Sequence, residues 1–277
     1  MDIKEIENSI ITTYRNKLWA PFIRAIKEFD LLKENDKVCV CISGGKDSML
    51  LAKMFEHLHK YSIFPFEVKY LFMNPGYNQE NLDKVLLNLK KLNINAEIIN
   101  SDIFEISNKM SDNPCFLCAR MRRGALYNYA KSLGCNKIAL GHHLDDVIET
   151  IMMSIFSNGT FESMRPCIHS TNHPGMELIR PMYYIREKDI KLWVKNSELE
   201  FINCACRLTE KNLKTGEGNR LFVKNLIKEL ELKDKSIPKN IFNSSINVKL
   251  DKLLGYEKDN IKHSFLEDYN KEKKWDL

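Results

Sequence analysis

The sequence predicts an α/β fold built on a parallel sheet, because short β-rich runs alternate with helical stretches between residues 37 and 156. The β-rich runs are 37–42, 66–73, 96–100 and 137–141. Between them, apolar residues recur at helical spacing, as in 47–60 and 78–92. Such crossovers cover both faces of a parallel sheet and leave ligands to bind at the carboxyl ends of its strands. Two glycine-bearing strand ends, at 43–45 and at Gly141, are therefore expected to face one crevice.

The helical segments outside this series suggest three parts. We expect an amphipathic helical lead-in over residues 1–35. We expect the α/β domain to span residues 36–190. Residues 191–277 predict a helical C-terminal extension that carries the late cysteines.

Composition narrows the class of protein. The chain has 277 residues, 44% of them hydrophobic, which is enough for a substantial core. The sequence has no apolar run long enough to span a bilayer and no signal-peptide pattern at its start. We therefore expect a cytoplasmic protein with no membrane partner. Its eight cysteines are then expected as core residues, metal ligands or nucleophiles. The net charge of +5 is compatible with a polyanionic partner but does not demonstrate one.

The loop "SGGKDS" (43–48) lies between a predicted strand and a predicted helix. The P-loop of GTPases requires Ser or Thr after its lysine, but Lys46 is followed by Asp47. The hexapeptide instead resembles the PP-loop of the ATP pyrophosphatases. The resemblance implies that the loop amides and the helix N-terminus grip the pyrophosphate half of ATP, while attack falls on the α-phosphorus.

Asp47 is the unexpected residue of this loop, since its charge repels phosphate. A carboxylate is tolerated there if it holds Mg²⁺, which offsets charge on the leaving pyrophosphate. The alternative is that Asp47 only caps the following helix.

The segment "ALGHHLDDVIET" (139–150) also resembles a family segment beside the nucleotide. Gly141 allows close approach of the backbone, and Asp145 and Asp146 begin a helix. One alternative is that the two carboxylates only stabilise the helix through its dipole. Another is that they form a metal site together with His142 and His143.

Four cysteines fall into two close pairs. Cys115 and Cys118 have C-x-x-C spacing immediately before a predicted helix, and Cys204 and Cys206 lie far along the chain. A structural Cys₄ zinc site and an iron-sulfur cluster held by three of the four are both open on chemistry alone. Cys39, Cys41, Cys135 and Cys167 are expected as core or surface thiols.

Four ordered motifs, "SGGKDS", "CFLCARMRRGALY", "KIALGHHLDD" and "RPMYYIREKDI", together resemble the tRNA 2-thiocytidine synthetases, which are iron-sulfur-dependent tRNA thiolases. The resemblance covers roughly residues 15–210. It implies a five-stranded, doubly wound parallel sheet of the PP-loop ATP pyrophosphatase kind, with helical N- and C-terminal extensions. It also implies ATP, Mg²⁺ and a 4Fe-4S cluster as cofactors.

The resemblance further implies the site residues. Catalytic roles fall to Asp47, Lys46 and Asp145. The ATP-binding residues are Ser43, Gly44, Gly45, Lys46, Asp47, Ser48, Met73, Gly141 and His142. The cluster ligands are Cys115, Cys118 and Cys204, with one iron left free of protein ligands. Because the later motif reads "CAC" rather than C-x-x-C, Cys206 is a rival for the third position.

The implied reaction is adenylation of the C2 oxygen of a tRNA pyrimidine, cytidine being favoured, followed by displacement of AMP by sulfur. The expected partners are tRNA and a sulfur donor, either sulfide or a persulfide-carrying protein. A homodimer is a further expectation. Arginine and lysine side chains are candidates for contacts to the RNA backbone: Arg120, Arg122, Arg123, Lys211, Lys214 and Arg220. Two rival functions stay open. One is an ATP-dependent thiolase or adenylating ligase that acts on another tRNA base or on a small molecule, and the other is a non-catalytic, zinc-stabilised nucleotide-binding module.

Overall fold

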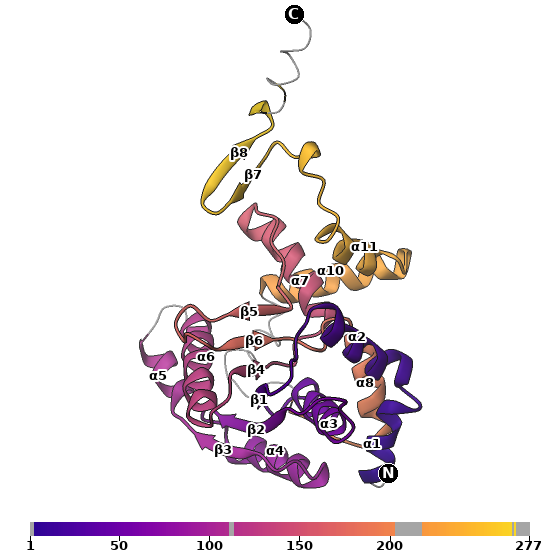
Figure 1. The fold of residues 1–277 in the computed structure, drawn as a ribbon, viewed down its shortest axis with the longest axis vertical. Helices are drawn as coiled ribbons and strands as arrows, with labels where there is room; N and C mark the ends of the chain where they lie inside the picture. Colours follow the sequence, from indigo (N-terminus) through magenta and orange to yellow (C-terminus); the bar gives the residue numbers. More distant parts are fainter. Residues whose placement is uncertain (1–2, 111–113, 203–217, 268, 270–277) are drawn as a thin grey trace, which may run out of the picture.

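The computed structural model describes residues 3–110, 114–202, 218–267 and 269, and a six-stranded sheet forms its centre. The strands are β1 (Lys37–Ile42), β2 (Glu67–Asn74), β3 (Glu97–Asn100), β4 (Lys137–Ala139), β5 (Cys167–His169) and β6 (Glu177–Ile179). Their order is β3-β2-β1-β4-β6-β5, in which only β5 is antiparallel to its neighbour (Figure 1). The predicted α/β class with five parallel strands is confirmed, and an antiparallel edge strand is added to it.

Alternate residues of β1 pack into different layers, as expected for a strand buried on both faces. Val38, Val40 and Ile42 belong to the large core that includes α3 (Lys46–Lys60). Cys39 and Cys41 belong to a smaller core with residues of α6 (Pro114–Ser132). Figure 1 shows α3 and α6 on opposite sides of the sheet. Both strand cysteines are therefore buried core thiols.

The N-terminal lead-in is helical and packs on the sheet domain. It comprises α1 (Ile3–Ile11), a π-helical turn (Arg15–Trp19) and α2 (Ala20–Glu28). Leu18 and Phe22 are fully buried, and the ring of Phe22 meets that of Phe55 in α3 edge-on at 5.7 Å between centroids. The apolar face of the lead-in thus completes the larger core.

The remaining crossovers are α4 (Gln79–Lys91), α5 (Ile103–Met110), α6 and α7 (Leu144–Met153). The start of α6 corrects one expectation. Because this helix begins at Pro114, Cys115 and Cys118 lie inside it rather than before it. The arginines of this motif follow beyond the first turn of the helix: Arg120, Arg122 and Arg123. Proline at the first helical position accounts for the early start. No helix in the described part of the chain is long and apolar enough to cross a membrane.

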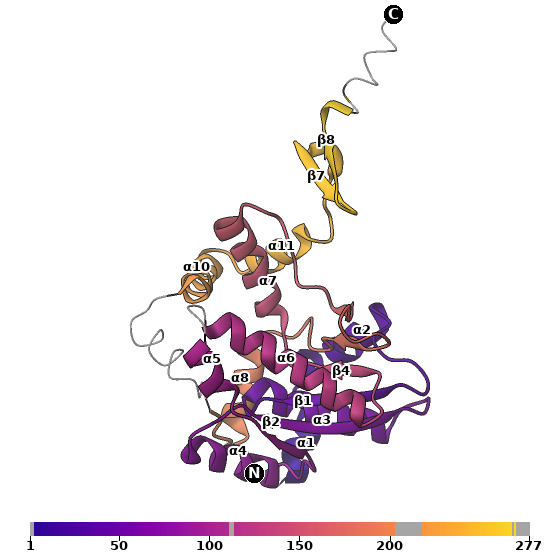
Figure 2. The same cartoon turned by 90° about the vertical axis from the view of Figure 1, so that its left-hand side faces the viewer.

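The C-terminal extension is helical only in part. After α8 (Glu187–Asn196), the helices α10 (Asn219–Lys233) and α11 (Ile237–Ser244) pack on α7. A β-hairpin of β7 (Gly255–Lys258) and β8 (Ile261–Ser264) then projects from the body (Figures 1 and 2). Its two turn residues, Asp259 and Asn260, both have positive φ, the conformation that tight hairpins require. The division at residues 35 and 190 stays a prediction.

Ion pairs join α10 to the helices around it. Glu187, at the start of α8, is buried and pairs with Lys224 of α10 at 2.8 Å, Lys191 at 3.0 Å and Lys46 of α3 at 3.3 Å. Further along α10, Glu231 pairs with Arg186 at 2.8 Å. A buried carboxylate is tolerated only with such compensation, so this network fixes α10 against the sheet domain.

The network predicts a pH dependence of stability. Burial alone would raise the pKa of Glu187, but Lys224, Lys191 and Lys46 outweigh it and hold that pKa far below the ordinary 4.5. Because the folded-state pKa is the lower one, the carboxylate stabilises the fold fully above pH 4.5 and loses this effect as the pH falls through the folded-state pKa. We expect Glu187→Gln to lower the free energy of unfolding at neutral pH and to flatten its decline in acid.

Urea unfolding at neutral and acidic pH measures this effect. Glu229→Gln, an exposed position on α10, is the matched control and should keep the wild-type pH dependence. A Glu187→Gln protein whose stability declines in acid as steeply as that of the wild type would contradict the assignment.

Candidate active site

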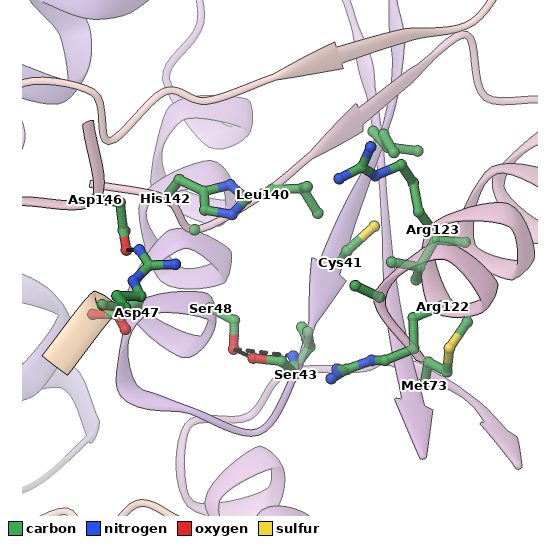
Figure 3. A pocket seen from close by; sticks show the side chains of 16 residues that line it. Cys41, Ser43, Asp47, Ser48, Met73, Arg122, Arg123, Leu140, His142 and Asp146 are labelled. Atoms are coloured by element: carbon green, nitrogen blue, oxygen red, sulfur yellow. Dashed lines mark hydrogen bonds and ion pairs between the residues drawn. The ribbon is translucent and has the colours of Figure 1, made fainter. Parts of the chain in front are cut away.

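A cavity of about 390 Å³ lies at the carboxyl ends of β1 and β4 (Figure 3). This is the switch point of the sheet, because the chain runs from β1 to β2 on one side and later returns to β4 on the other. Open α/β sheets bind ligands at such points. The wall includes Ser43, Asp47 and Ser48 from the first strand end and Gly141 and His142 from the second. The two glycine-bearing strand ends thus face one crevice, as expected.

Hydrogen bonds within the loop 43–48 fix its shape. The Ser43 amide donates to Ser48 Oγ at 3.1 Å, and the Ser48 hydroxyl donates to the Gly45 carbonyl at 2.9 Å. Gly44 has φ +82°, and a Cβ there would lie 2.4 Å from Cγ2 of Val85. Only glycine fits this position.

The same loop leads into α3, whose positive end faces the crevice. Gly45 is the N-cap of α3 and has no side chain, so the first amides of the helix are left for a ligand. Asp47 lies in the first turn and does not cap α3. The alternative role for this carboxylate, as a helix cap, is therefore not supported.

Gly141 brings the second strand end into direct contact with the loop. A Cβ at Gly141 would lie 3.0 Å from the carbonyl carbon of Asp47 and 3.1 Å from the amide nitrogen of Ser48. These neighbours are backbone atoms of a helix start, which cannot move aside cheaply. The glycine therefore sets the distance between the loop and α7.

Two acidic side chains meet at this contact. Asp47 Oδ2 accepts a hydrogen bond from Lys46 Nζ at 3.1 Å, whereas its Oδ1 is buried and accepts none from the described residues. Asp146, from the first turn of α7, accepts from the His143 amide at 3.0 Å and pairs with Arg220. Nδ1 of His142 is also buried without a partner among the described residues.

Oδ1 of Asp47, together with Asp146 on the same side of the cavity (Figure 3), fits a magnesium ion. Mg²⁺ typically takes one or two carboxylates and completes its shell with water and phosphate oxygens. Among the described residues, no group of three or more histidine, cysteine, aspartate or glutamate side chains is placed to hold a metal ion.

Burial and neighbouring charges set the protonation states here. Burial holds the pKa of His142 at about 4, so the ring is neutral at pH 7. Burial alone would raise the pKa of Asp146, but His143 and Arg220 outweigh it and lower that pKa. Asp146 is therefore an anion when a metal ion arrives.

Asp145 and Lys46, two of the expected catalytic residues, are engaged by α8. The carboxylate of Asp145 accepts from the Glu187 amide at 2.6 Å and from Arg186 Nε at 3.2 Å. Lys46 Nζ is shared between Asp47 and Glu187. These contacts hold Asp145 at the start of α8, and of the two neighbouring aspartates of α7 it is Asp146 that lines the cavity. The catalytic roles of Asp145 and Lys46 stay predictions.

Helix α6 forms the opposite wall (Figure 3). Ala119, Arg122, Arg123 and Leu126 line the cavity from this helix, and Met73 lines it from the end of β2. Arg120 is exposed. Sequence analysis did not include Cys41, Leu140, Asp146 and Arg220 among the nucleotide-site residues, although all four line the cavity.

The cysteines are described only in part. Cys118 is half-buried and precedes Ala119 in the cavity wall, and for Cys115 the structure describes the helix backbone alone. Cys204, Cys206, Lys211 and Lys214 lie outside the described residues. Two described residues that flank the segment 203–217, Ile202 and Arg220, lie near the crevice. Ile202 Cδ1 lies 3.1 Å from the position of a Cβ on Gly44, and Arg220 lines the cavity.

Comparison with known proteins agrees with this geometry. The family model of the PP-loop domain matches residues 18–211. The tRNA-cytidine(32) 2-sulfurtransferase of Citrifermentans bemidjiense is 32% identical over 88% of this chain and 93% of its own length. That of Coxiella burnetii is 35% identical over 84% and 90%. The solved U34-tRNA thiolase NcsA from Methanococcus maripaludis, with its 4Fe-4S cluster, has a TM-score of 0.61 at 24% identity, covering 86% of this chain and 82% of that one.

The chain belongs to the PP-loop family and, within it, to the family of the tRNA-cytidine(32) 2-sulfurtransferases. The family predicted from the four motifs is confirmed.

The close approach at Gly141 gives a direct test of the site. Gly141→Ala should push the loop 43–48 away from α7, and we expect affinity for Mg-ATP to fall about tenfold or more, since ~1.4 kcal/mol suffices for that factor. Gly124→Ala is the control, because a Cβ there meets nothing within 4 Å and alanine suits a helix. Titration calorimetry measures both proteins. Unchanged affinity in Gly141→Ala would refute the close-contact account.

Proposed function

We propose that this chain catalyses the ATP-dependent thiolation of tRNA at C2 of a cytidine, with the cytoplasm as its compartment. Position 32 of the tRNA is proposed from the name of its relatives. The observation that carries the proposal is the crevice itself, in which a carboxylate oxygen of Asp47 that accepts no hydrogen bond from the described residues lies beside the amide end of α3. Such a site suits a metal-bound polyphosphate.

The reaction divides into two displacements. The C2 oxygen of the cytidine attacks the α-phosphorus of ATP, and pyrophosphate leaves. Sulfur then adds at C2, the bond from C2 to oxygen breaks, and the original oxygen departs in AMP. No net oxidation or reduction occurs if sulfur enters at the level of sulfide.

The residues of the crevice serve the first displacement. The loop amides and the N-terminus of α3 bind and orient the leaving pyrophosphate, where its charge is stabilised most. Asp47 and Asp146 hold Mg²⁺, which offsets that charge. His142 lines the cavity, and its neutral ring can donate or accept a hydrogen bond there without adding charge.

The RNA lies along α6 in this proposal. Arg122 and Arg123 line the cavity on the side opposite Asp47, so a phosphate on either side of the target base can reach them. Contacts of this kind position an RNA without reading its sequence. The target cytidine then enters the cavity out of its stack.

A 4Fe-4S cluster suits the available cysteines, since such clusters are held by thiolates and Cys118 precedes a residue of the cavity wall. We propose Cys115, Cys118 and Cys204 as its ligands, with Cys206 as the rival to Cys204. A cluster with three protein ligands supplies an iron that can bind sulfur. The proposed donor is sulfide, or a persulfide-carrying protein from which a thiol reductant releases the outer sulfur as sulfide and becomes a disulfide. The homodimer is part of the proposal.

The function is tested with unmodified tRNA, Mg-ATP and sulfide under anaerobic conditions. We expect Asp47→Asn to reduce thiolation and tRNA-dependent pyrophosphate release about a hundredfold or more, because a metal ligand contributes several kcal/mol to transition-state stabilisation. Asp251→Asn, on the projecting segment before the hairpin, is the control. Wild-type turnover in Asp47→Asn would refute the metal role, and turnover of a small molecule without tRNA would favour the rival ligase function.

The cysteine ligands are separated by four single changes to alanine. Loss of a true ligand should remove iron and the visible absorbance of the cluster and stop thiolation, whereas Cys206→Ala should keep all three. Cys167→Ala, in β5, is the control. Iron, sulfide and zinc analysis after anaerobic purification gives the readout. Zinc retention that depends on all four cysteines would establish the structural-site alternative instead.

A further inference from the structure

Arg220 reaches the nucleotide crevice from α10, outside the PP-loop sheet. Its Nε donates to Glu149 Oε2 at 2.9 Å, and its Nη2 pairs with Oδ1 of Asp146. The side chain is half-exposed and lines the cavity together with Asp47. The guanidinium thus covers one of the two carboxylates that fit magnesium.

A magnesium ion bound by Asp146 would compete with Arg220 for the same carboxylate. When Asp146 ligates a metal ion, its attraction for the guanidinium weakens, because the ion neutralises the charge that holds Nη2. Glu149 is buried, with Lys224 at 4.0 Å as its other cation, so it continues to need the Nε hydrogen bond. Glu149 therefore retains Arg220 at the cavity while the Nη nitrogens become available.

We propose that Arg220 is a phosphate-contacting residue of the nucleotide site. Its Nη2 pairs with Asp146 in the free protein, and its Nη nitrogens turn to phosphate oxygens when Mg-ATP binds. The fork of a guanidinium matches phosphate oxygens well, and Glu149 serves as its pivot. The inference rests on the proposed function, because it requires ATP in this crevice.

Calorimetric binding of Mg-ATP and of adenosine distinguishes this role from a structural one. Arg220→Gln should weaken Mg-ATP binding about tenfold to a hundredfold, the usual worth of hydrogen bonds to a charged group, and leave adenosine binding unchanged. Arg220→Lys, which keeps the charge without the fork, should lie between. Lys228→Gln removes one exposed charge from the same helix and should bind as the wild type.

Equal Mg-ATP affinity in Arg220→Gln and wild type would overturn the inference. Equal weakening for Mg-ATP and adenosine would also overturn it, since this is what loss of a helix anchor gives. If Arg220→Gln does not fold, the comparison of Arg220→Lys with wild type decides in the same way. Failure of the wild type itself to bind Mg-ATP would instead remove the proposed function, so the two failures are distinct.

Discussion

The contact between Gly141 and the backbone of Asp47 and Ser48 is the constraint on which the site depends. Beyond the pairing of β1 with β4 in the sheet, it lets the start of α3 lie directly against the end of β4 at the switch point of the sheet. Any side chain at Gly141 would push the start of α3 away from the start of α7. The spacing of Asp47 and Asp146, the pair proposed to hold magnesium, follows from it.

Around this contact the chain gathers more charge than a buried site normally tolerates. Glu187, Lys224 and Glu149 alternate in sign, and each compensates its neighbours. Arg220 extends the alternation to Asp146, and Lys46 pairs with Oδ2 of Asp47, whereas Oδ1 of Asp47 accepts no hydrogen bond from the described residues. A buried carboxylate oxygen without a hydrogen-bond donor indicates where a cation can bind.

Sequence patterns predicted those parts of the molecule that local chemistry determines. The first four parallel strands follow from β-rich runs, and the loop 43–48 follows from the two glycines after the first of these runs. Strand β6 has three residues, too few to show a period, and β5 is antiparallel to it. The hairpin has a local signal in its turn, where Asp259 and Asn260 are residue types that tolerate positive φ. The tasks of Asp145 and Arg220 depend on partners 41 and 74 residues away, which no local pattern reveals.

The central claim is that this crevice adenylates the C2 oxygen of a tRNA cytidine. It is tested most directly with tRNA whose target cytidine carries ¹⁸O at C2, incubated with Mg-ATP and sulfide under anaerobic conditions. Mass spectrometry of the products then follows the label. The account predicts that ¹⁸O appears in AMP in proportion to the thiolated cytidine formed. Thiolation with the label in inorganic phosphate or in water would contradict it.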